Sequence, residues 1–220
     1  MKFFFPSIIL VIFSFSIKAQ IGLIYNIAFK IDNELITQTK SQNKDYKILN
    51  LATTEDMPKE VSDTIIFISE KAMEQQLNAT VTSIIPKEKL VMAALPEHLM
   101  YLPVGTLNKA IKSGEKDFYI NVQCHISASG GTRITFGKDS YSKVKPKLSL
   151  KVTAYNKSKS AVYEKEIVLK DFEKLRSHSF EKTYGLKGFG QNTDKVTVSE
   201  TLTSNDILKM YLMAIEDLSK

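Results

Sequence analysis

The sequence predicts an α/β (α+β) fold, in which helices pack on a mixed sheet of about five strands to make a single two-layer domain. Two observations support this prediction. The segment 117–170 alternates apolar and polar residues with a period of two, which is typical of strands buried on one face. Segments near 59–77, 106–113 and 204–218 repeat their apolar residues with the period of a helix instead. Each of these helices needs a sheet to cover its apolar side.

The strand at 117–127 is the best patterned of the chain. Its alternate apolar residues share one face: Phe118, Ile120, Val122, Cys124 and Ile126. The segments 148–155 and 161–169 repeat the alternation on either side of a turn at 156–160, and therefore form a hairpin. We expect these strands to be the centre of the sheet, with Cys124 as a small buried hydrophobe.

The helices have clear boundaries. The helix at 59–77 carries a line of apolar residues, Val61, Ile65, Ile68 and Ala72. The closing helix at 204–218 follows Thr203, which has capping-box spacing to Asp206. The short helix at 106–113 leads directly into the central strand.

Other strands are expected at 22–31, 46–52 and 79–85, where apolar and β-branched residues gather. Prolines interrupt the segment 86–103, for which we expect a short helix and an apolar loop. The remaining connections are polar. We find no internal repeat and no linker, so residues 21–220 are expected to form one globular domain.

Irregular loops are predicted near 128–147 and 171–200, because both regions are rich in glycine and in polar residues. A loop of about twenty residues is unusual unless it forms a hairpin of its own or has a function. Within these regions, 132–136 alternates enough to extend a strand, and 195–203 enough to form an edge strand.

Residues 1–20 are predicted to be a signal peptide. A short basic start precedes an apolar run from Phe3 to Ile17, shorter than the roughly 20 residues of a membrane-spanning helix, and Ala19 is a small residue suited to cleavage. The alternative is an uncleaved amino-terminal anchor. We expect no transmembrane span after signal removal, and no cysteine follows the run for lipid attachment. The predicted location is therefore periplasmic or secreted.

The charge argues against nucleic acid as a partner. The net charge of +6 falls to +4 when Lys2 and Lys18 leave with the signal peptide. Arg133 and Arg176 are the only arginines, whereas sites that recognise bases favour arginine over lysine. A lysine-rich surface of this kind mainly maintains solubility.

No catalytic, cofactor or metal motif stands out. The three histidines are far apart and lack a paired metal-ligand spacing, and no GxSxG turn is present. We therefore expect no cofactor and no metal, and we favour a role without catalysis. The enzymatic alternative is a periplasmic hydrolase whose site is assembled from loops around His98, Ser129 and His178.

The most promising functional residues lie in the first irregular region, where basic and aromatic side chains are interleaved. This combination suits an acidic partner or a glycan. The candidate partner-binding residues are Arg133, Phe136, Lys138, Tyr141, Lys143 and Lys145, and Lys147 extends the basic run. The alternative is a loop whose charges are simply solvated.

The segments "TLNKAIKSGEKDFYINVQCHIS" and "KLSLKVTAYNKSKSAVYEKEI", followed by a closing helix, resemble bacterial envelope domains. The order of elements over 46–218 is similar to the amino-terminal TolB domain and to CsgG, although the lipid-anchoring cysteine of CsgG is missing. The resemblance implies an exported envelope protein that acts as a non-catalytic binding or assembly module. Its partner would be another envelope protein or a surface polymer, with polyanion or glycan binding through 133–147 as an alternative. The oligomeric state is not indicated.

Overall fold

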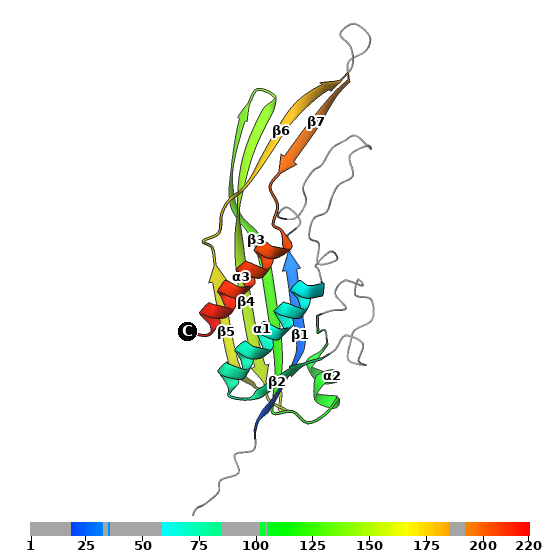
Figure 1. The fold of residues 1–220 in the computed structure, drawn as a ribbon, viewed down its shortest axis with the longest axis vertical. Helices are drawn as coiled ribbons and strands as arrows, with labels where there is room; N and C mark the ends of the chain where they lie inside the picture. The colour runs from blue at the N-terminus through cyan, green and yellow to red at the C-terminus, as the bar shows by residue number, and fades with distance from the viewer. Residues whose placement is uncertain (1–18, 33–34, 36–58, 85–101, 104, 185–191) are drawn as a thin grey trace, which may run out of the picture.

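The computed structural model describes residues 19–32, 35, 59–84, 102–103, 105–184 and 192–220 (Figure 1). The predicted signal peptide (except its last two residues), the strand at 46–52 and most of the segment 86–103 lie outside the described residues. The elements in order are β1 (Ile21–Ile31), α1 (Lys59–Leu77), β2 (Thr80–Ser83), α2 (Leu107–Lys112), β3 (Phe118–Phe136), β4 (Asp139–Tyr155), β5 (Ala161–Leu169), β6 (Leu175–Tyr184), β7 (Asn192–Ser199) and α3 (Ser204–Leu218).

These strands form one mixed sheet of seven strands in the order β2-β1-β3-β4-β6-β7, with β5 also paired to β4. β1 runs parallel to both β2 and β3, and the other pairings are antiparallel. β5 and β6 follow one another along the same edge of β4. The predicted α+β class is therefore confirmed, with β3 and β4 at the centre of the sheet.

The main core lies between the sheet and two helices. α1 and α3 lie side by side on one face of the sheet (Figure 1). The inward residues of β3 are at most 2% exposed there: Ile120, Val122, Cys124 and Ile126. Burying a side chain of this size contributes about 1.5–3 kcal/mol to stability. The alternation of 117–127 and the buried position of Cys124 are confirmed.

A buried hydroxyl pair joins the two helices. Tyr211 of α3 is fully buried, and its hydroxyl lies 2.7 Å from Ser69 Oγ of α1. The Ser69 hydroxyl also donates to the Ile65 carbonyl at 2.6 Å. The Tyr211 ring packs against Phe29 of β1 with ring centroids 5.7 Å apart. Tyr211 thus contacts both the other helix and the sheet.

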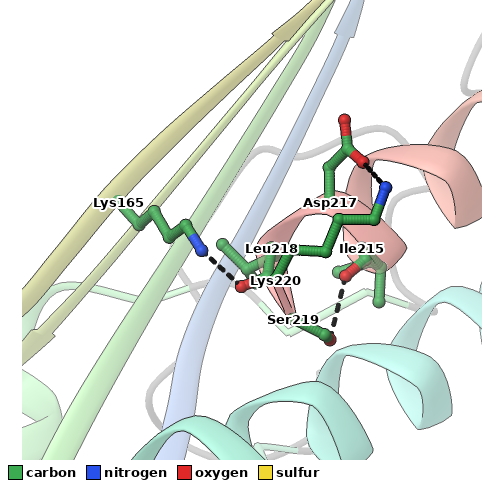
Figure 2. Close-up of polar contacts among 6 residues, drawn as sticks. All are labelled: Lys165, Ile215, Asp217, Leu218, Ser219 and Lys220. Atoms are coloured by element: carbon green, nitrogen blue, oxygen red, sulfur yellow. Dashed lines mark hydrogen bonds and ion pairs between the residues drawn. The ribbon is translucent and has the colours of Figure 1, made fainter.

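Both ends of α3 are secured. At the start, Thr203 and Asp206 form the predicted capping box. At the end, Lys165 of β5 donates to the carbonyl oxygen of Leu218 at 2.7 Å, as Figure 2 shows. A cation at this position also balances the partial negative charge of the helix end. Figure 2 also shows Lys220 paired with Asp217 at 2.6 Å.

α2 covers one end of the opposite sheet face. Tyr119 of β3 is fully buried there, and its hydroxyl donates to the Gly114 carbonyl at 2.9 Å. Ala110 of α2 belongs to the same small cluster, with Leu23 and Tyr25 of β1. The pattern had placed Tyr119 on an outward polar face, and α2 explains why this end of the face is buried instead.

The region 128–147 is not an irregular loop, and this prediction was wrong. β3 continues to Phe136 and β4 begins at Asp139, so the hairpin spans the region almost completely. A bulge at Gly130 is the main irregularity, and Gly130 has a φ of +62°, which glycine adopts without strain. The strands lie beyond the core, so their sequence carries no regular apolar face to reveal them.

The region 171–200 was also wrongly predicted as irregular. It holds β6 and β7, which account for the strands beyond the five expected. Residues 185–191 between them are outside the part of the chain that the structure describes. The edge strand suggested at 195–203 corresponds to the second half of β7.

Candidate functional site

The outer parts of four strands project beyond the helices (Figure 1). We call this part the blade: residues 127–136 of β3, residues 139–147 of β4, and all of β6 and β7. β1 stops pairing with β3 at Ile126, and from there β3 continues as part of the blade. Neither α1 nor α3 covers the tip of the blade (Figure 1).

One face of the blade carries a row of apolar and aromatic side chains. Ile134, Tyr141, His178 and Val198 are directly opposed on β3, β4, β6 and β7, so they share one face, which we call the outer face. Ile134, Tyr141 and Val198 are 54%, 46% and 55% exposed. Phe136, 68% exposed, lies one step further along the same face. A group of large apolar side chains this exposed is a feature of binding surfaces.

The middle of the row is an aromatic stack. The rings of Tyr141 and His178 are parallel within 4°, with centroids 4.2 Å apart. Phe180 packs against the other side of His178, with centroids 4.9 Å apart. His178 Nε2 is shielded from solvent and has no hydrogen-bond partner among the described residues, because Asp139 Oδ2 is 3.8 Å away. The stack thus gathers the rings of Tyr141, His178 and Phe180 on the outer face and leaves one buried polar atom without a partner among the described residues.

The opposite face of the blade is different in chemistry. Hydroxyl groups face one another across β6 and β7: Ser177 with Ser199 at 3.0 Å, and Ser179 with Thr197 at 2.7 Å. Such cross-strand pairs stabilise a sheet without an apolar core. The blade therefore concentrates its apolar surface on the outer face.

The outer face is hollowed into a cleft of about 640 Å³. The row residues Ile134, Tyr141, His178 and Val198 line its apolar part. Charged side chains line its border: Lys143, Arg176 and Glu200. A cleft with apolar walls and a few polar groups fits the usual composition of a ligand site.

The predicted basic residues do not all lie on the same face of the blade. Lys143, Lys145 and Lys147 alternate along β4, and so share the outer face with Tyr141. Arg133 lies on the opposite face, because its neighbours Thr132 and Ile134 point outward. Lys138 lies in the turn and pairs with Glu181 at 2.7 Å.

Two cations outside the predicted set join the outer face. Lys143 lies directly opposite Arg176 of β6. Like charges at directly opposed positions destabilise a sheet. Lys174 joins Lys143 and Lys145 around a second cavity of about 250 Å³ beside the glycine bulge. Sequence reasoning missed Lys174, Arg176 and the Tyr141 stack with His178, because 171–200 was taken as irregular and residues 175–180 carry no alternating apolar face that would reveal a strand.

The residues of the hydrolase alternative are not assembled into a pair. His98 lies outside the described residues. Ser129 is opposite Lys145 and His178 is opposite Tyr141, so they are offset by four ladder positions, about 13 Å along the strands, and also lie on opposite sides of β4. The Ser129 hydroxyl donates to the Lys145 carbonyl at 3.1 Å.

A separate polar pair lies on the central part of the sheet. His125 Nε2 is 3.0 Å from Asp32 Oδ1, and the Ala128 backbone N–H donates to Asp32 Oδ2 at 3.1 Å. The hydrogen bond from His125 holds the pKa of Asp32 below its usual value. This pair fixes the end of β1 against β3.

The described residues contain no group of three or more His, Cys, Asp or Glu side chains placed to hold a metal ion. None of the described helices is both long and apolar enough to cross a membrane.

No protein-family model matches the chain, and no curated protein does either. Solved structures with similar shapes include a putative neuraminyllactose-binding hemagglutinin homolog from Helicobacter pylori, at 9% identity and a TM-score of 0.39, covering 91% of this chain and 81% of that one. They also include the lipoprotein GNA1162 from Neisseria meningitidis, at 9% identity and a TM-score of 0.29, covering 90% of this chain and 96% of that one. Likenesses at these TM-scores support no inference about function.

Proposed function

We propose that the chain is an exported bacterial envelope protein that acts as a non-catalytic binding or assembly module, and that the outer face of the blade is its binding surface. The observation that carries the proposal is the exposed cross-strand row of Ile134, Tyr141, His178 and Val198. The partner is another envelope protein or a surface polymer. Export by the predicted signal peptide, and the resemblance to TolB and CsgG domains, belong to the same proposal.

These exposed side chains contribute little to the stability of the folded blade. An exposed Ile or Val on a sheet contributes less than about half of what it contributes when buried, because most of its apolar surface stays in water. A partner that covers the row removes this surface from water without any rearrangement of the blade. Aromatic residues at the centre of such a patch are common anchors of binding.

A pull-down tests the proposal. The tagged mature protein captures its partner from an envelope extract, and the variant Ile134→Ser/Val198→Ser is expected to lose it. The matched control is Val162→Ser/Val168→Ser, which changes two β5 side chains of similar exposure, 48% and 43%. Capture that survives the Ile134 and Val198 changes, or that is lost equally in the control, contradicts the proposal.

Polyanion or glycan binding is a second candidate. It is favoured by the cations that gather on the same outer face, above all by the opposed pair Lys143 and Arg176.

A further inference from the structure

The cations on the outer face of the blade outnumber the carboxylates beside them, which are Asp171 near Lys145 and Glu200 near Arg176. Lys143 and Arg176 are opposed across β4 and β6, and such a pair of like charges destabilises the sheet. In the described part of the chain, Lys143, Lys174 and Arg176 have no ion-pair partner for their side chains. A bound anion between them would turn this repulsion into attraction.

The backbone brings these cations together. At the bulge, Gly131 approaches β4 so closely that a Cβ would lie 2.9 Å from the Lys143 carbonyl oxygen. The cavity beside it is lined by Lys143, Lys145 and Lys174, and by Ser129 and Thr132. Lys145 has one weak partner, because Asp171 is 3.4 Å away and fully exposed to solvent. The cavity is therefore a cationic hollow with hydroxyl groups on its wall.

This cavity and the aromatic cleft are continuous. Thr132 and Lys143 line both of them. The positions of Tyr141 and Lys145 are about 13 Å apart along β4, which is longer than a single sugar ring. The combined site has an aromatic end and a cationic end, which suits a ligand that carries rings as well as negative charges.

We propose that this combined site binds an acidic polysaccharide, with its sulfate or carboxylate groups on Lys143, Lys145, Lys174 and Arg176 and a sugar ring on the stack formed by Tyr141. The inference rests on the proposed function, because it names the partner class of the same surface. The carboxylate of Glu200 also lines the cleft, where it accepts from the Arg176 backbone N–H at 2.8 Å and has further acceptor capacity for sugar hydroxyl groups.

Binding of the mature protein to four polymers tests the inference: dextran sulfate, alginate, neutral dextran and inorganic polyphosphate. The two acidic polysaccharides are expected to bind and neutral dextran is not. Lys143→Ala/Arg176→Ala should weaken that binding by about tenfold and make its salt dependence shallower. Tyr141→Ala should weaken binding of the acidic polysaccharides but not of polyphosphate.

The matched control is Lys109→Ala/Lys112→Ala, which removes the same charge from exposed lysines of α2 at the other end of the molecule (Figure 1). Equal losses in the control and in the site variant would overturn the inference, as would polyphosphate binding more tightly than both polysaccharides. Thermal unfolding of each variant, expected to be unchanged or raised for Lys143→Ala/Arg176→Ala, shows that the fold is intact. The proposed function fails in a different assay, when Ile134→Ser/Val198→Ser still captures its partner.

Discussion

Tyr141 and His178 lie directly opposite one another on β4 and β6, and their rings stack with centroids 4.2 Å apart. This contact lies within the short ladder, residues 140–144 with 175–179, that joins the β3–β4 hairpin to the β6–β7 hairpin. The stack therefore stabilises the blade as well as forming the centre of its exposed row. Its two roles can be separated by substitutions.

Tyr141→Phe keeps the stacked ring, whereas Tyr141→Ala removes it. We expect Tyr141→Ala to lower the free energy of unfolding by about 1 kcal/mol, because aromatic pairs contribute roughly 0.5–1.5 kcal/mol beyond their buried area. Tyr141→Phe should stay close to the parent protein. Urea denaturation measures both, and equal destabilisation by the two variants would contradict a role for the ring.

The glycine bulge should tolerate substitution at one position and not at the next. A Cβ on Gly131 would meet the Lys143 carbonyl oxygen at 2.9 Å, so Gly131→Ala should push β3 away from β4 and cost about 1–3 kcal/mol. Gly130 has a positive φ with nothing within 4 Å, and asparagine adopts that conformation readily, so Gly130→Asn should cost less than about 1 kcal/mol. Hydrogen exchange of blade amides should accelerate in the first variant and change little in the second.

Cys124 should be inert while the protein is folded. It is 2% exposed, and burial raises the pKa of its thiol far above the ordinary value. The thiolate is the reactive species, so alkylation by iodoacetamide at pH 8 should be roughly 100-fold slower in the native protein than in urea. Fast alkylation of the native protein, at a rate that urea does not change, would show that the β3 core opens readily.

The core and the blade differ in how far the sequence predicts them. In the central strands and the long helices, one side of each element is buried, so its apolar residues recur with a regular spacing that reveals the element. Val122 and Leu150 belong to such patterns in the strands, and Ile65 and Ile215 belong to such patterns in the helices. α1 and α3 occupy the expected residues for this reason. β6 has no such marker, because Ser177 and Ser179 face one side and Arg176 and His178 the other.

The candidate site was predictable only in part. Lys143, Lys145 and Tyr141 were found because basic and aromatic residues alternate along one segment. Their neighbours Arg176 and His178 come from another hairpin. Which residues of two strands lie opposite one another depends on the pairing register, and a single sequence does not specify that register. Phe136 lies on the outer face, whereas Arg133 and Lys138 do not join the cluster.

The pair of Asp32 and His125 predicts a pH-dependent stability. The hydrogen bonds from His125 and from the Ala128 N–H lower the pKa of Asp32 in the folded protein below its value of about 3.9 in an unfolded chain. Because the pKa of Asp32 is lower in the folded protein than in the unfolded chain, the ionised carboxylate stabilises the fold. This stabilisation is fully present above the pKa of the unfolded chain and is lost as the pH falls through the pKa of the folded protein. The relevant window is therefore below about pH 4.

Asp32→Asn tests this pair without changing its shape. At pH 7 the substitution should cost about 1 kcal/mol, because a charged acceptor is replaced by a neutral one at a partly exposed position. As the pH falls below about 4, the difference from the parent protein should shrink, since Asp32 itself becomes neutral. The control is Asp63→Asn on the exposed side of α1. Urea unfolding at pH 7 and at pH 3 measures both variants, and a cost for Asp32→Asn that is the same at the two pH values would show that the charge of Asp32 does not stabilise the contact between β1 and β3.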